Sequence, residues 1–525
     1  MLYNFKDIEN KWQKFWAENN TFKAENNSSL PKFYVLDMLP YPSGAGLHVG
    51  HPLGYIASDI YSRYKRLKGF NVLHPQGYDS FGLPAEQYAI QTGRHPLQTT
   101  NENISRYREQ LDRLGFSFDW SREIRTSNKN YYKWTQLMFI KLFNSWYDID
   151  SNKSKDIKEL ISIFESNGNS KINASQSDVI KTFESKDWNS YSLNKKDEIL
   201  LNYRLAYLSE IDVNWCPKLG TVLANDEIID GLSERGGHEE LRKKMTQWSM
   251  RISVYGERLL QGLDTLDWSE SLKETQRNWI GKSVGAAVEF KMLDDKDEVK
   301  ELTIKTFTTR PDTIFGVDFM VVAPEHSLIE TITPSTHKAA VAEYIGYVKS
   351  RSERERIAEK KITGCFTGAY VTNPFNNALI PVWISEYVLA GYGTGAIMAV
   401  PCGDDRDFKF AQHFNIPITN IIGDAYNGEE ANPTKEAILS NSDFLNGIVQ
   451  KDAIAIVAKK LEAMGIGKSK INYRMRDAAF SRQRYWGEPF PIKWKDGIAY
   501  PLSEKELPLL LPTVDNYSPG PEGEG

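Results

Sequence analysis

Residues 33–51 read FYVLDMLPYPSGAGLHVGH. It begins with a short apolar run, passes through a turn rich in proline and glycine, and leads into a helical pattern at about His48. A second apolar run, FNVLHPQG, follows at residues 70–77. The order strand, helix, strand is typical of a βαβ unit, so we expect an α/β fold with a parallel sheet.

His48 and His51 stand at the start of the expected helix, just after the glycine-rich turn. Unpaired N–H groups and the positive end of a helix dipole attract phosphate there, and histidine can donate hydrogen bonds to a triphosphate. Gly50 would let a flat base approach the backbone without a Cβ atom in the way. A metal site would need a further ligand, which no nearby Cys or His supplies. From this stretch alone, a purely structural role for the pair stays open.

The chain is large and slightly acidic. It has 525 residues, of which 41% are hydrophobic, and a formal net charge of -5. This length suggests about three or four domains. The negative charge argues against a uniformly basic nucleic-acid surface, so a polyanion would be held by local patches. The candidate basic residues, which also fit solvated helix faces, are Arg63, Lys65, Arg66, Lys68, Arg474, Arg476, Arg482 and Arg484.

Cysteine content and hydropathy predict a cytoplasmic protein. Cys216, Cys365 and Cys402 form no CxxC pair, so neither a disulfide framework nor a compact thiolate metal site is encoded. Residues 1–16 carry charges throughout an amphipathic pattern, which predicts a docked helix and not a signal peptide. No apolar run approaches the roughly 20 residues of a membrane span, so we expect no membrane partner.

Amino-acid composition separates two further segments in the rest of the chain. Residues 151–205 are rich in Ser, Asn and Lys, but Asp156 and Glu159 form a helix N-terminal signature before an apolar stripe that stops at Gly168. We therefore expect a small helical insertion there. Short β-rich runs separated by charged or Gly/Pro turns follow, from about residue 284 to residue 470, and predict a separate β-rich domain.

Five motifs, taken in order, resemble the class I aminoacyl-tRNA synthetases, and among them the leucyl-tRNA synthetases most. The motifs are YPSGAGLHVGH, GYDSFGLPAE, TTRPDT, GTGAIMAVP and SRQRYWG, and MLPYPSG, VNWCPKLGTVLANDEIIDG and QRNWIGKS support the leucine-specific group. The resemblance implies a Rossmann-like catalytic domain interrupted by an inserted β-rich editing domain. The expected segments are 1–150 (catalytic, first half), 151–205 (helical insertion), 206–283 (zinc-module-like segment and connective helices), 284–470 (editing) and 471–525 (return to the catalytic domain).

The same resemblance implies an activity and its substrates. A leucine–tRNA ligase activates leucine with ATP, accompanied by Mg²⁺, and transfers it from leucyl-adenylate to tRNA(Leu). The histidine motif, His48, Gly50 and His51, would bind the ATP phosphates. An apolar pocket with one carboxylate suits a zwitterionic aliphatic amino acid. By the resemblance, Met38, Leu39 and Tyr41 would line the side-chain pocket and Asp79 would hold the substrate ammonium.

A second site would hydrolyse tRNA that carries a wrong amino acid. It is needed because one methylene group changes the binding free energy in an apolar pocket by only about 1 to 3 kcal/mol, which is too little for accurate translation. Hydrolytic editing is the known remedy in this enzyme class. Asp407 would pair with the α-amino group of a misplaced amino acid, threonine hydroxyls would position ribose and water, and Thr313 would crowd out leucine. The implied editing residues are Thr308, Thr309, Arg310, Asp312, Thr313, Met398, Val400, Asp404 and Asp407. Without the resemblance, TTRPDT predicts only a strand that ends in a turn, and the aspartates an acidic surface turn.

Two features depart from the family. Cys216 is followed by no further cysteine at metal spacing, and a lone Cys with a lone His238 cannot complete a four-ligand site, so no structural zinc is expected. The family's Lys-Met-Ser-Lys-Ser loop and anticodon-binding domain do not occur before Gly525. We therefore expect a truncated chain, an incomplete gene model, or one subunit of a split enzyme whose C-terminal half is a separate chain. A different hypothesis, a tRNA-binding trans-editing hydrolase, is disfavoured because a pure hydrolase has no use for the histidine motif.

Overall fold

The computed structural model describes residues 3–515 and 517, apart from residues 43, 45, 178–179, 225–226, 230, 294–298, 350, 352–355, 357–360 and 390–393. The chain divides into two compact units. Unit 1 comprises residues 1–251 and 477–525, and unit 2 comprises residues 252–476. Within the described ranges, no helix has the length and apolar character needed to cross a membrane.

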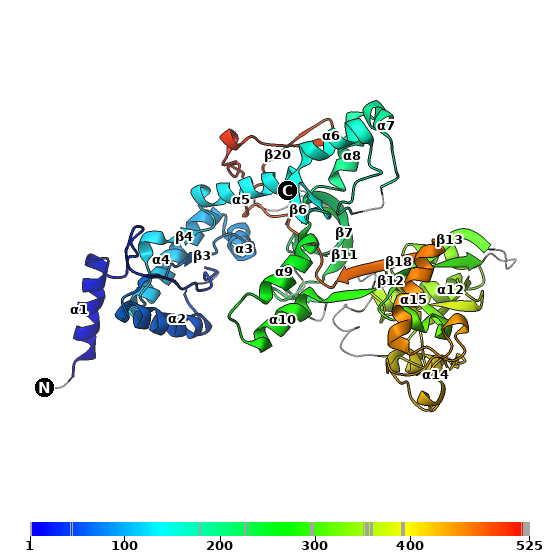
Figure 1. Cartoon of the computed structure of the whole chain (residues 1–525). Coiled ribbons are helices and arrows are strands. Elements are labelled where there is room, and N and C mark those ends of the chain that lie inside the picture. The colour runs from blue at the N-terminus through cyan, green and yellow to red at the C-terminus, as the bar shows by residue number, and fades with distance from the viewer. Residues whose placement is uncertain are drawn as a thin grey trace. The chain divides into compact units, whose positions relative to one another are not determined.

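Unit 1 contains the expected strand–helix–strand element. Strand β1 (Lys32–Tyr34) and strand β2 (Asn71–Leu73) pair in parallel, with Phe33 opposite Val72. Helix α2 (Gly50–Leu67) connects them (Figure 1). The βαβ prediction is therefore confirmed, and the helix begins two residues after His48.

The other elements of the first 150 residues surround this unit. The first helix forms as predicted, but none of its residues is buried, and its apolar side chains from Phe5 to Phe15 remain exposed. The helix is nevertheless docked through its other side, because Gln13 Nε2 donates to the carbonyl of Arg113 at 2.9 Å and the Arg63 guanidinium lies 5.0 Å from the centre of the Trp16 ring. These elements are α1 (Phe5–Glu18), the parallel pair β3 (Gly77–Tyr78) and β4 (Ile124–Arg125), α3 (Leu83–Thr92), α4 (Pro96–Leu114), the 3₁₀ helix η1 (Trp120–Arg122) and α5 (Lys129–Phe143).

The segment 151–205 is a small helical module with its own core. Asp156 accepts a hydrogen bond from the N–H of Lys158 at 2.9 Å, and the helix that follows ends at Gly168, so the predicted helix is confirmed. Phe164 and Trp188 are fully buried and belong to the same aromatic cluster. The elements are β5 (Ser145–Asp148) and β6 (Lys153–Asp156), which form a hairpin, and α6 (Ile157–Asn167), α7 (Ser185–Ser190) and α8 (Leu193–Leu201).

A four-stranded antiparallel sheet joins the two sequence segments of unit 1. Its order is β19-β11-β7-β8, and β19 comes from the segment after unit 2. The strands are β7 (Ala206–Cys216), β8 (Thr221–Leu223), β11 (Leu241–Met250) and β19 (Ala478–Ala479). Smaller elements of unit 1 are the hairpins β9 (Ile228–Ile229) with β10 (Leu232–Ser233) and β20 (Ile492–Lys495) with β21 (Ile498–Pro501), and the 3₁₀ helix η7 (Glu504–Glu506).

Unit 2 is built on a seven-stranded sheet with the path β13-β12-β15-β16-β14-β17, and β18 also pairs with β12. The end strands of this path, β13 and β17, contact each other, so the sheet curls round on itself. Its core is apolar and includes the fully buried Phe290, Met320 and Val382. The strands are β12 (Lys282–Leu293), β13 (Val299–Thr308), β14 (Phe319–Val322), β15 (Cys365–Thr372), β16 (Leu379–Ile384), β17 (Ala396–Ala399) and β18 (Gly467–Tyr473).

Helices cover parts of this sheet, and α15 packs against β18 (Figure 1). The β-rich domain expected from the sequence is therefore present. The helices of unit 2 among the described residues are η3 (Ile252–Tyr255), α9 (Gly256–Leu263), α10 (Glu270–Ile280), η4 (Pro311–Gly316), α11 (Leu328–Ile332), α12 (Lys338–Lys349), α14 (Asp405–Phe414), η5 (Gly423–Ala425), η6 (Asp443–Leu445) and α15 (Gln450–Ala463).

Candidate functional site

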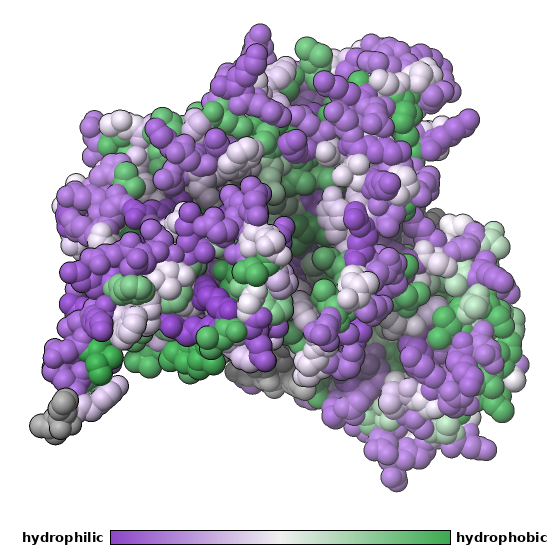
Figure 2. Space-filling view, turned by 60° about the vertical axis from the view of Figure 1, so that its left-hand side comes forward, coloured by the Kyte–Doolittle hydropathy of each residue, from purple (hydrophilic) through white to green (hydrophobic). Residues whose placement is uncertain are grey.

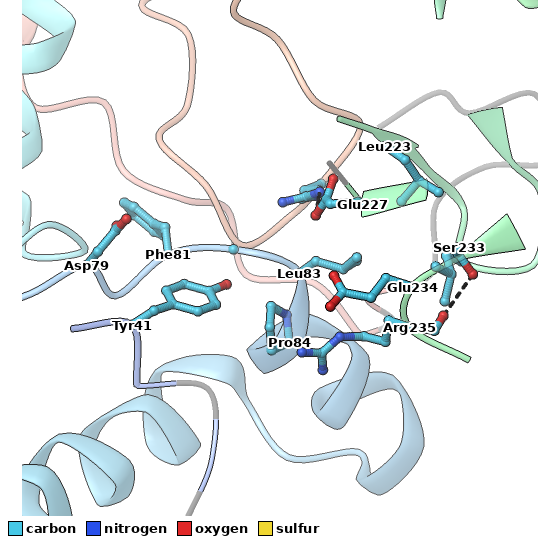
Figure 3. A pocket seen from close by; sticks show the side chains of 13 residues that line it. Tyr41, Asp79, Phe81, Leu83, Pro84, Leu223, Glu227, Ser233, Glu234 and Arg235 are labelled. Carbon is cyan, nitrogen blue, oxygen red and sulfur yellow. Dashed lines mark hydrogen bonds and ion pairs between the residues drawn. The ribbon is translucent and has the colours of Figure 1, made fainter. Parts of the chain in front are cut away.

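A cavity of about 430 Å³ in unit 1 contains two of the four predicted leucine-pocket residues, Tyr41 and Asp79 (Figure 3). Its lining comes from four sequence regions: the end of the β1 segment, the loop before α3, the β8–β10 region and the segment after unit 2. The lining residues are Tyr41, Asp79, Phe81, Gly82, Leu83, Pro84, Leu219, Leu223, Glu227, Ser233, Glu234, Arg235 and Arg484.

Tyr41 fixes the shape of this cavity. A Cβ atom at Gly82 would lie 2.0 Å from the Tyr41 hydroxyl, and Gly82 has a φ of +123°, so only glycine fits there. Figure 3 shows the Tyr41 ring between Asp79 and Pro84. Burial raises the pKa of the Tyr41 phenol well above its usual range, so the hydroxyl remains a proton donor.

The Asp79 side chain is exposed to the cavity, and hydrogen bonds hold both its backbone and its carboxylate. Its N–H donates to the carbonyl of Pro40 at 3.1 Å, and its Oδ1 accepts a hydrogen bond from Thr126 Oγ1 at 3.2 Å. Glu488 adds a second acidic group in this region: burial, followed by the negative charge of Asp79, raises the pKa of the Glu488 carboxyl. The arrangement favours a cationic ligand beside Asp79.

Hydrogen bonds join the loop around Trp486 to the loop that carries Asp79. Trp486 donates its backbone N–H to Glu86 Oε2 at 2.7 Å and its indole N–H to the carbonyl of Ser80 at 2.9 Å. The N–H of Gly82 donates to the carbonyl of Trp486 at 3.1 Å. Two motifs on either side of unit 2 in the sequence thereby build one wall of the cavity.

The lining of the cavity also includes charged residues that the sequence did not single out for this pocket. Arg484 donates to Thr221 Oγ1 at 3.2 Å and lies 3.7 Å from Glu227. The guanidinium group of Arg235 lies next to Pro84 in Figure 3. The SRQRYWG motif contains Arg484, so the sequence could have indicated this residue as part of the site. Arg235 stands in a glycine-rich turn, where no motif could have indicated it.

The other two predicted pocket residues, Met38 and Leu39, do not line this cavity. Met38 is 71% exposed and Leu39 is half-buried. The carbonyl of Met38 accepts a hydrogen bond from the Tyr55 hydroxyl at 2.9 Å. Their part of the chain therefore contacts α2 through its backbone.

The structure brings the two histidines together at the start of α2. His48 is exposed and His51 is buried, and their ring centroids lie 4.2 Å apart. The N–H of His48 donates to His51 Nδ1 at 3.2 Å. Burial, followed by the nearby His48, lowers the pKa of His51. A Cβ atom at Gly50 would meet no atom within 4 Å, so the space above this backbone is open.

Cys216 acts as a small apolar core residue. It is fully buried and packs with Leu83, Leu219 and Leu223, beside the cavity. His238 lines a neighbouring cavity of about 410 Å³. In the described part of the chain, no group of three or more His, Cys, Asp or Glu side chains is placed to hold a metal ion.

The TTRPDT motif of unit 2 forms the end of β13 and the start of η4. Arg310 donates through Nε and Nη2 to the fully buried carboxylate of Asp312, at 3.0 and 2.8 Å. The hydroxyl of Thr313 donates to the carbonyl of Arg310 at 2.9 Å. Thr308 accepts the N–H of Arg310 at 3.0 Å, and Thr309 is exposed. The motif is a rigid turn that presents Thr309 to solvent.

The second editing motif forms the end of β17 and the start of α14. Met398 and Val400 are buried, and Asp404 caps α14 by accepting the N–H groups of Arg406 and Asp407. Asp407 is 4% exposed. One of its oxygens accepts the N–H of Val400 at 2.9 Å.

The other oxygen of Asp407, Oδ1, makes no well-aligned hydrogen bond among the described residues, although the Tyr387 hydroxyl lies close to this carboxyl and opposes the rise of its pKa. It lies 3.9 Å from Arg406 Nε, which is too far for a hydrogen bond. Burial, followed by the negative charge of Asp404, raises the pKa of Asp407 to about 7. Such a carboxyl gains its charge readily when a cation binds.

The two editing motifs lie on neighbouring strands, because β13 contacts β17. Arg310 also donates to the carbonyl of Thr434 at 3.2 Å, and the N–H of Asn432 donates to the carbonyl of Cys402 at 2.9 Å. The segment 432–434 thus connects both motifs.

Two protein families match this chain. The family described as "tRNA synthetases class I (M)" matches residues 33–160, and "Leucyl-tRNA synthetase, editing domain" matches residues 277–462. The first match covers the βαβ element, the histidine pair and Asp79, and the second covers both editing motifs.

Curated relatives and a solved structure match the chain over nearly its whole length. A leucine–tRNA ligase of Christiangramia forsetii is 62% identical over 100% of this chain and 54% of its own length, and one of Flavobacterium psychrophilum is 61% identical over 100% and 56%. A crystal structure titled as a ternary complex of an Agrobacterium radiobacter K84 LeuRS with tRNA and LeuAMS has a TM-score of 0.68 and 31% identity, covering 97% of this chain and 53% of that one. The chain therefore spans about half the length of the relatives it matches.

Proposed function

Because the chain belongs to the leucyl-tRNA synthetase family, with a Rossmann-like class I catalytic domain interrupted by an editing domain, we propose that it provides the leucine-binding and editing sites of a leucine–tRNA ligase. The reaction is the ATP-dependent formation of leucyl-adenylate and transfer of leucine to tRNA(Leu). The observation that carries this proposal is the cavity beside Tyr41 and Asp79, which the loops around Ser80 and Trp486 build together.

Leucine binds in this cavity with its ammonium group at Asp79. The carboxylate is exposed to the cavity, and the apolar side chains of Phe81, Leu219 and Leu223 line the same space. An aliphatic zwitterion needs such a combination of one anionic group and apolar walls. Met38 and Leu39 contribute through their backbone positions, and Tyr41 closes the pocket.

ATP, which arrives with Mg²⁺, binds at the start of α2. The positive end of the α2 dipole and the rings of His48 and His51 face its phosphates, and the open space above Gly50 accommodates the base. Hydrogen bonds from the histidines stabilise the charge that develops on the leaving pyrophosphate. We propose that the protein holds no structural zinc. Cys216 is enclosed by leucine side chains, and the set of ligands that a zinc ion needs is incomplete.

Unit 2 hydrolyses mischarged tRNA(Leu). The free oxygen of Asp407 binds the α-amino group of the misplaced amino acid, and the hydroxyl of Thr309 lies near the ribose or the attacking water. Thr313, which is fixed to the Arg310 carbonyl, restricts the side-chain space against leucine. The remaining editing residues, Thr308, Arg310, Asp312, Met398, Val400 and Asp404, hold these groups in place.

Activation is tested by leucine-dependent ATP–pyrophosphate exchange. The protein used is a chimera that joins this chain to the part of the Christiangramia forsetii relative outside its matched span. Asp79→Ala should raise the leucine KM by about 10-fold or more, because a charge-assisted hydrogen bond is lost. Asp515→Ala, which changes another aspartate of unit 1, serves as the control. Equal KM values for Asp79→Ala and the parent would exclude the ammonium role.

Editing is tested by timing the deacylation of isoleucyl-tRNA(Leu). Asp407→Ala should slow hydrolysis by about 10- to 10²-fold and leave leucine activation unchanged. Asp405→Ala is the matched control, because Asp405 is exposed and its partner among the described residues is Lys409, one helical turn away. If both variants hydrolyse at the parental rate, Asp407 is not an editing residue. Hydrolysis without any leucine activation in the parent would favour the trans-editing hydrolase.

A further inference from the structure

Two buried oxygen atoms beside the second editing motif lack well-aligned hydrogen bonds. They are Oδ1 of Asp407 and the hydroxyl of Tyr387, and neither has a hydrogen-bond partner of good geometry among the described residues. Figure 2 shows hydrophilic residues over most of the visible surface, where water can bind their polar atoms. The two oxygens have almost no contact with solvent, so each needs a partner inside the protein.

Tyr387 and Asp407 are neighbours in unit 2. Tyr387 follows β16, and Asp407 lies in the first turn of α14. The guanidinium carbon of Arg406 lies 4.5 Å from the centre of the Tyr387 ring, and its Nε lies 3.9 Å from Asp407 Oδ1. The centre of the Tyr387 ring is also 5.9 Å from that of Phe410, on the same helix. These contacts fix the ring and bring its hydroxyl close to the carboxyl.

One oxygen of Asp407 already has a donor, because Oδ2 accepts the N–H of Val400 at 2.9 Å. Arg406 is too far away to serve Oδ1, and Asp404 is a negative acceptor that caps α14. The Tyr387 hydroxyl is the donor that remains in the described surroundings of this carboxyl. Burial raises the pKa of Tyr387 well above its usual range, so this hydroxyl keeps its proton.

We propose that Tyr387 is a positioning residue for Asp407, and that its hydroxyl donates to Oδ1 and holds the carboxylate in place for the α-amino group of a misplaced amino acid. This inference rests on the proposed editing function. One donor on each oxygen fixes the plane of the carboxylate. Because a carboxylate oxygen has more than one lone pair, Oδ1 accepts the tyrosine hydroxyl and the substrate ammonium together.

The Tyr387 hydroxyl also favours the charged form of Asp407. Burial and the negative charge of Asp404 raise the pKa of this carboxyl to about 7, whereas Arg406, the N–H of Val400 and the Tyr387 hydroxyl act in the opposite direction. Without the hydroxyl, the pKa of Asp407 should be higher still. Fewer molecules would then carry the negative charge that binds an ammonium group, and the deficit would be largest at low pH.

The first test compares the parent and Tyr387→Phe, both in the chimera, in the deacylation of isoleucyl-tRNA(Leu) from pH 6 to pH 8.5. The variant keeps the ring that contacts Arg406 and Phe410. We expect hydrolysis to slow about 5-fold or more at pH 6.5 and less than about 2-fold at pH 8.5, because the ionised fraction differs most below the pKa. The ratio of the two rates cancels the titration of the substrate's own amino group. Tyr370→Phe, which removes an exposed hydroxyl from β15, should match the parent at every pH.

The second test requires no tRNA. Thermal stability of the 525-residue chain is measured from pH 5 to pH 9. Stability linked to Asp407 is lost as pH rises to its folded pKa, so this loss should continue to a higher pH in Tyr387→Phe than in the parent or in Tyr370→Phe.

Either of two results would overturn the inference. The first is a rate ratio between Tyr387→Phe and the parent that is the same at every pH. The second is a loss of stability that ends at the same pH in both proteins. A parent that does not hydrolyse isoleucyl-tRNA(Leu) would refute the proposed editing function, while the stability measurement would still decide whether Tyr387 acts on Asp407.

Discussion

His51 accepts the N–H of His48 on Nδ1, which leaves Nε2 to carry the proton of the neutral ring. Because the pKa of His51 is lowered, the ring is neutral at pH 7. In the ATP site proposed above, this form would donate one hydrogen bond to a phosphate oxygen without adding a positive charge. The sequence could place both histidines at a helix start, but it could not assign these different roles, which depend on a 3.2 Å contact and on burial.

We predict that pyrophosphate exchange in the chimera is independent of pH between 7 and 8.5, because neutral His51 is the working form over that range. His51→Ala should lower exchange by about 10²-fold or more, as expected for a lost transition-state contact. The control is His413→Ala, an exposed histidine of α14. A parental rate that falls as pH rises through 7 would mean that the imidazolium form is required.

We predict that Asp407 lowers the stability of the folded protein at alkaline pH. The folded pKa, about 7, lies above the unfolded value near 4, so the folded state binds the proton more tightly. Stability from this group is therefore present at low pH and is lost as pH rises to about 7. Between pH 5 and pH 8, the parent should lose more thermal stability than Asp407→Asn does. Asp405→Asn, with its exposed carboxylate, should follow the parent, and a parallel decline in all three proteins would contradict the raised pKa.

Several elements could be predicted from sequence because their signals are local. The helix 157–167 has its cap and stop residues in the sequence, and the βαβ unit has its apolar runs and turn. The cavity could only be predicted in part. Its walls meet through contacts such as that of Trp486 with Ser80, which no periodic pattern encodes. Likewise, an amphipathic pattern predicts that α1 forms, but it does not say what its apolar face contacts.

We predict that Trp486→Phe destabilises unit 1 by about 1 to 3 kcal/mol, because the buried carbonyl of Ser80 loses the indole N–H that it accepts. The leucine KM should rise, since this contact holds the loop that carries Asp79. Denaturant unfolding and exchange kinetics measure the two effects. Trp494→Phe is the matched control, because Trp494 is 56% exposed, and it should change stability by no more than about 0.5 kcal/mol. Equal effects of the two substitutions would refute the role of the loop contact.

At the scale of the molecule, the motif order was enough to predict two bodies, one inserted in the other. The expected segment 284–470 left out two helices that the structure assigns to unit 2, α9 and α10. The reason is a contact that sequence does not reveal. Glu257 of α9 accepts hydrogen bonds from Lys282 at 2.6 Å and from Tyr473 at 3.2 Å, and these residues lie on β12 and β18.

We predict two separate thermal unfolding transitions, one for each unit, because each has its own core. Phe290→Ala should lower one transition temperature through loss of about 3 to 5 kcal/mol of packing, and Phe139→Ala should lower the other. Differential scanning calorimetry distinguishes the transitions. A single transition that both substitutions shift together would show that the units unfold as one.

The pairing of β12 with β18 has a consequence for synthesis on the ribosome. These antiparallel strands bring the start and the end of unit 2 together, since Lys282 lies opposite Tyr473. Unit 2 can therefore close as soon as its last strand has emerged. Unit 1 must wait longer, because its sheet lacks β19 and its Phe81 ring lacks Trp486 until those residues are translated. The two sequence segments of unit 1 can therefore complete their common sheet only after unit 2 has been translated.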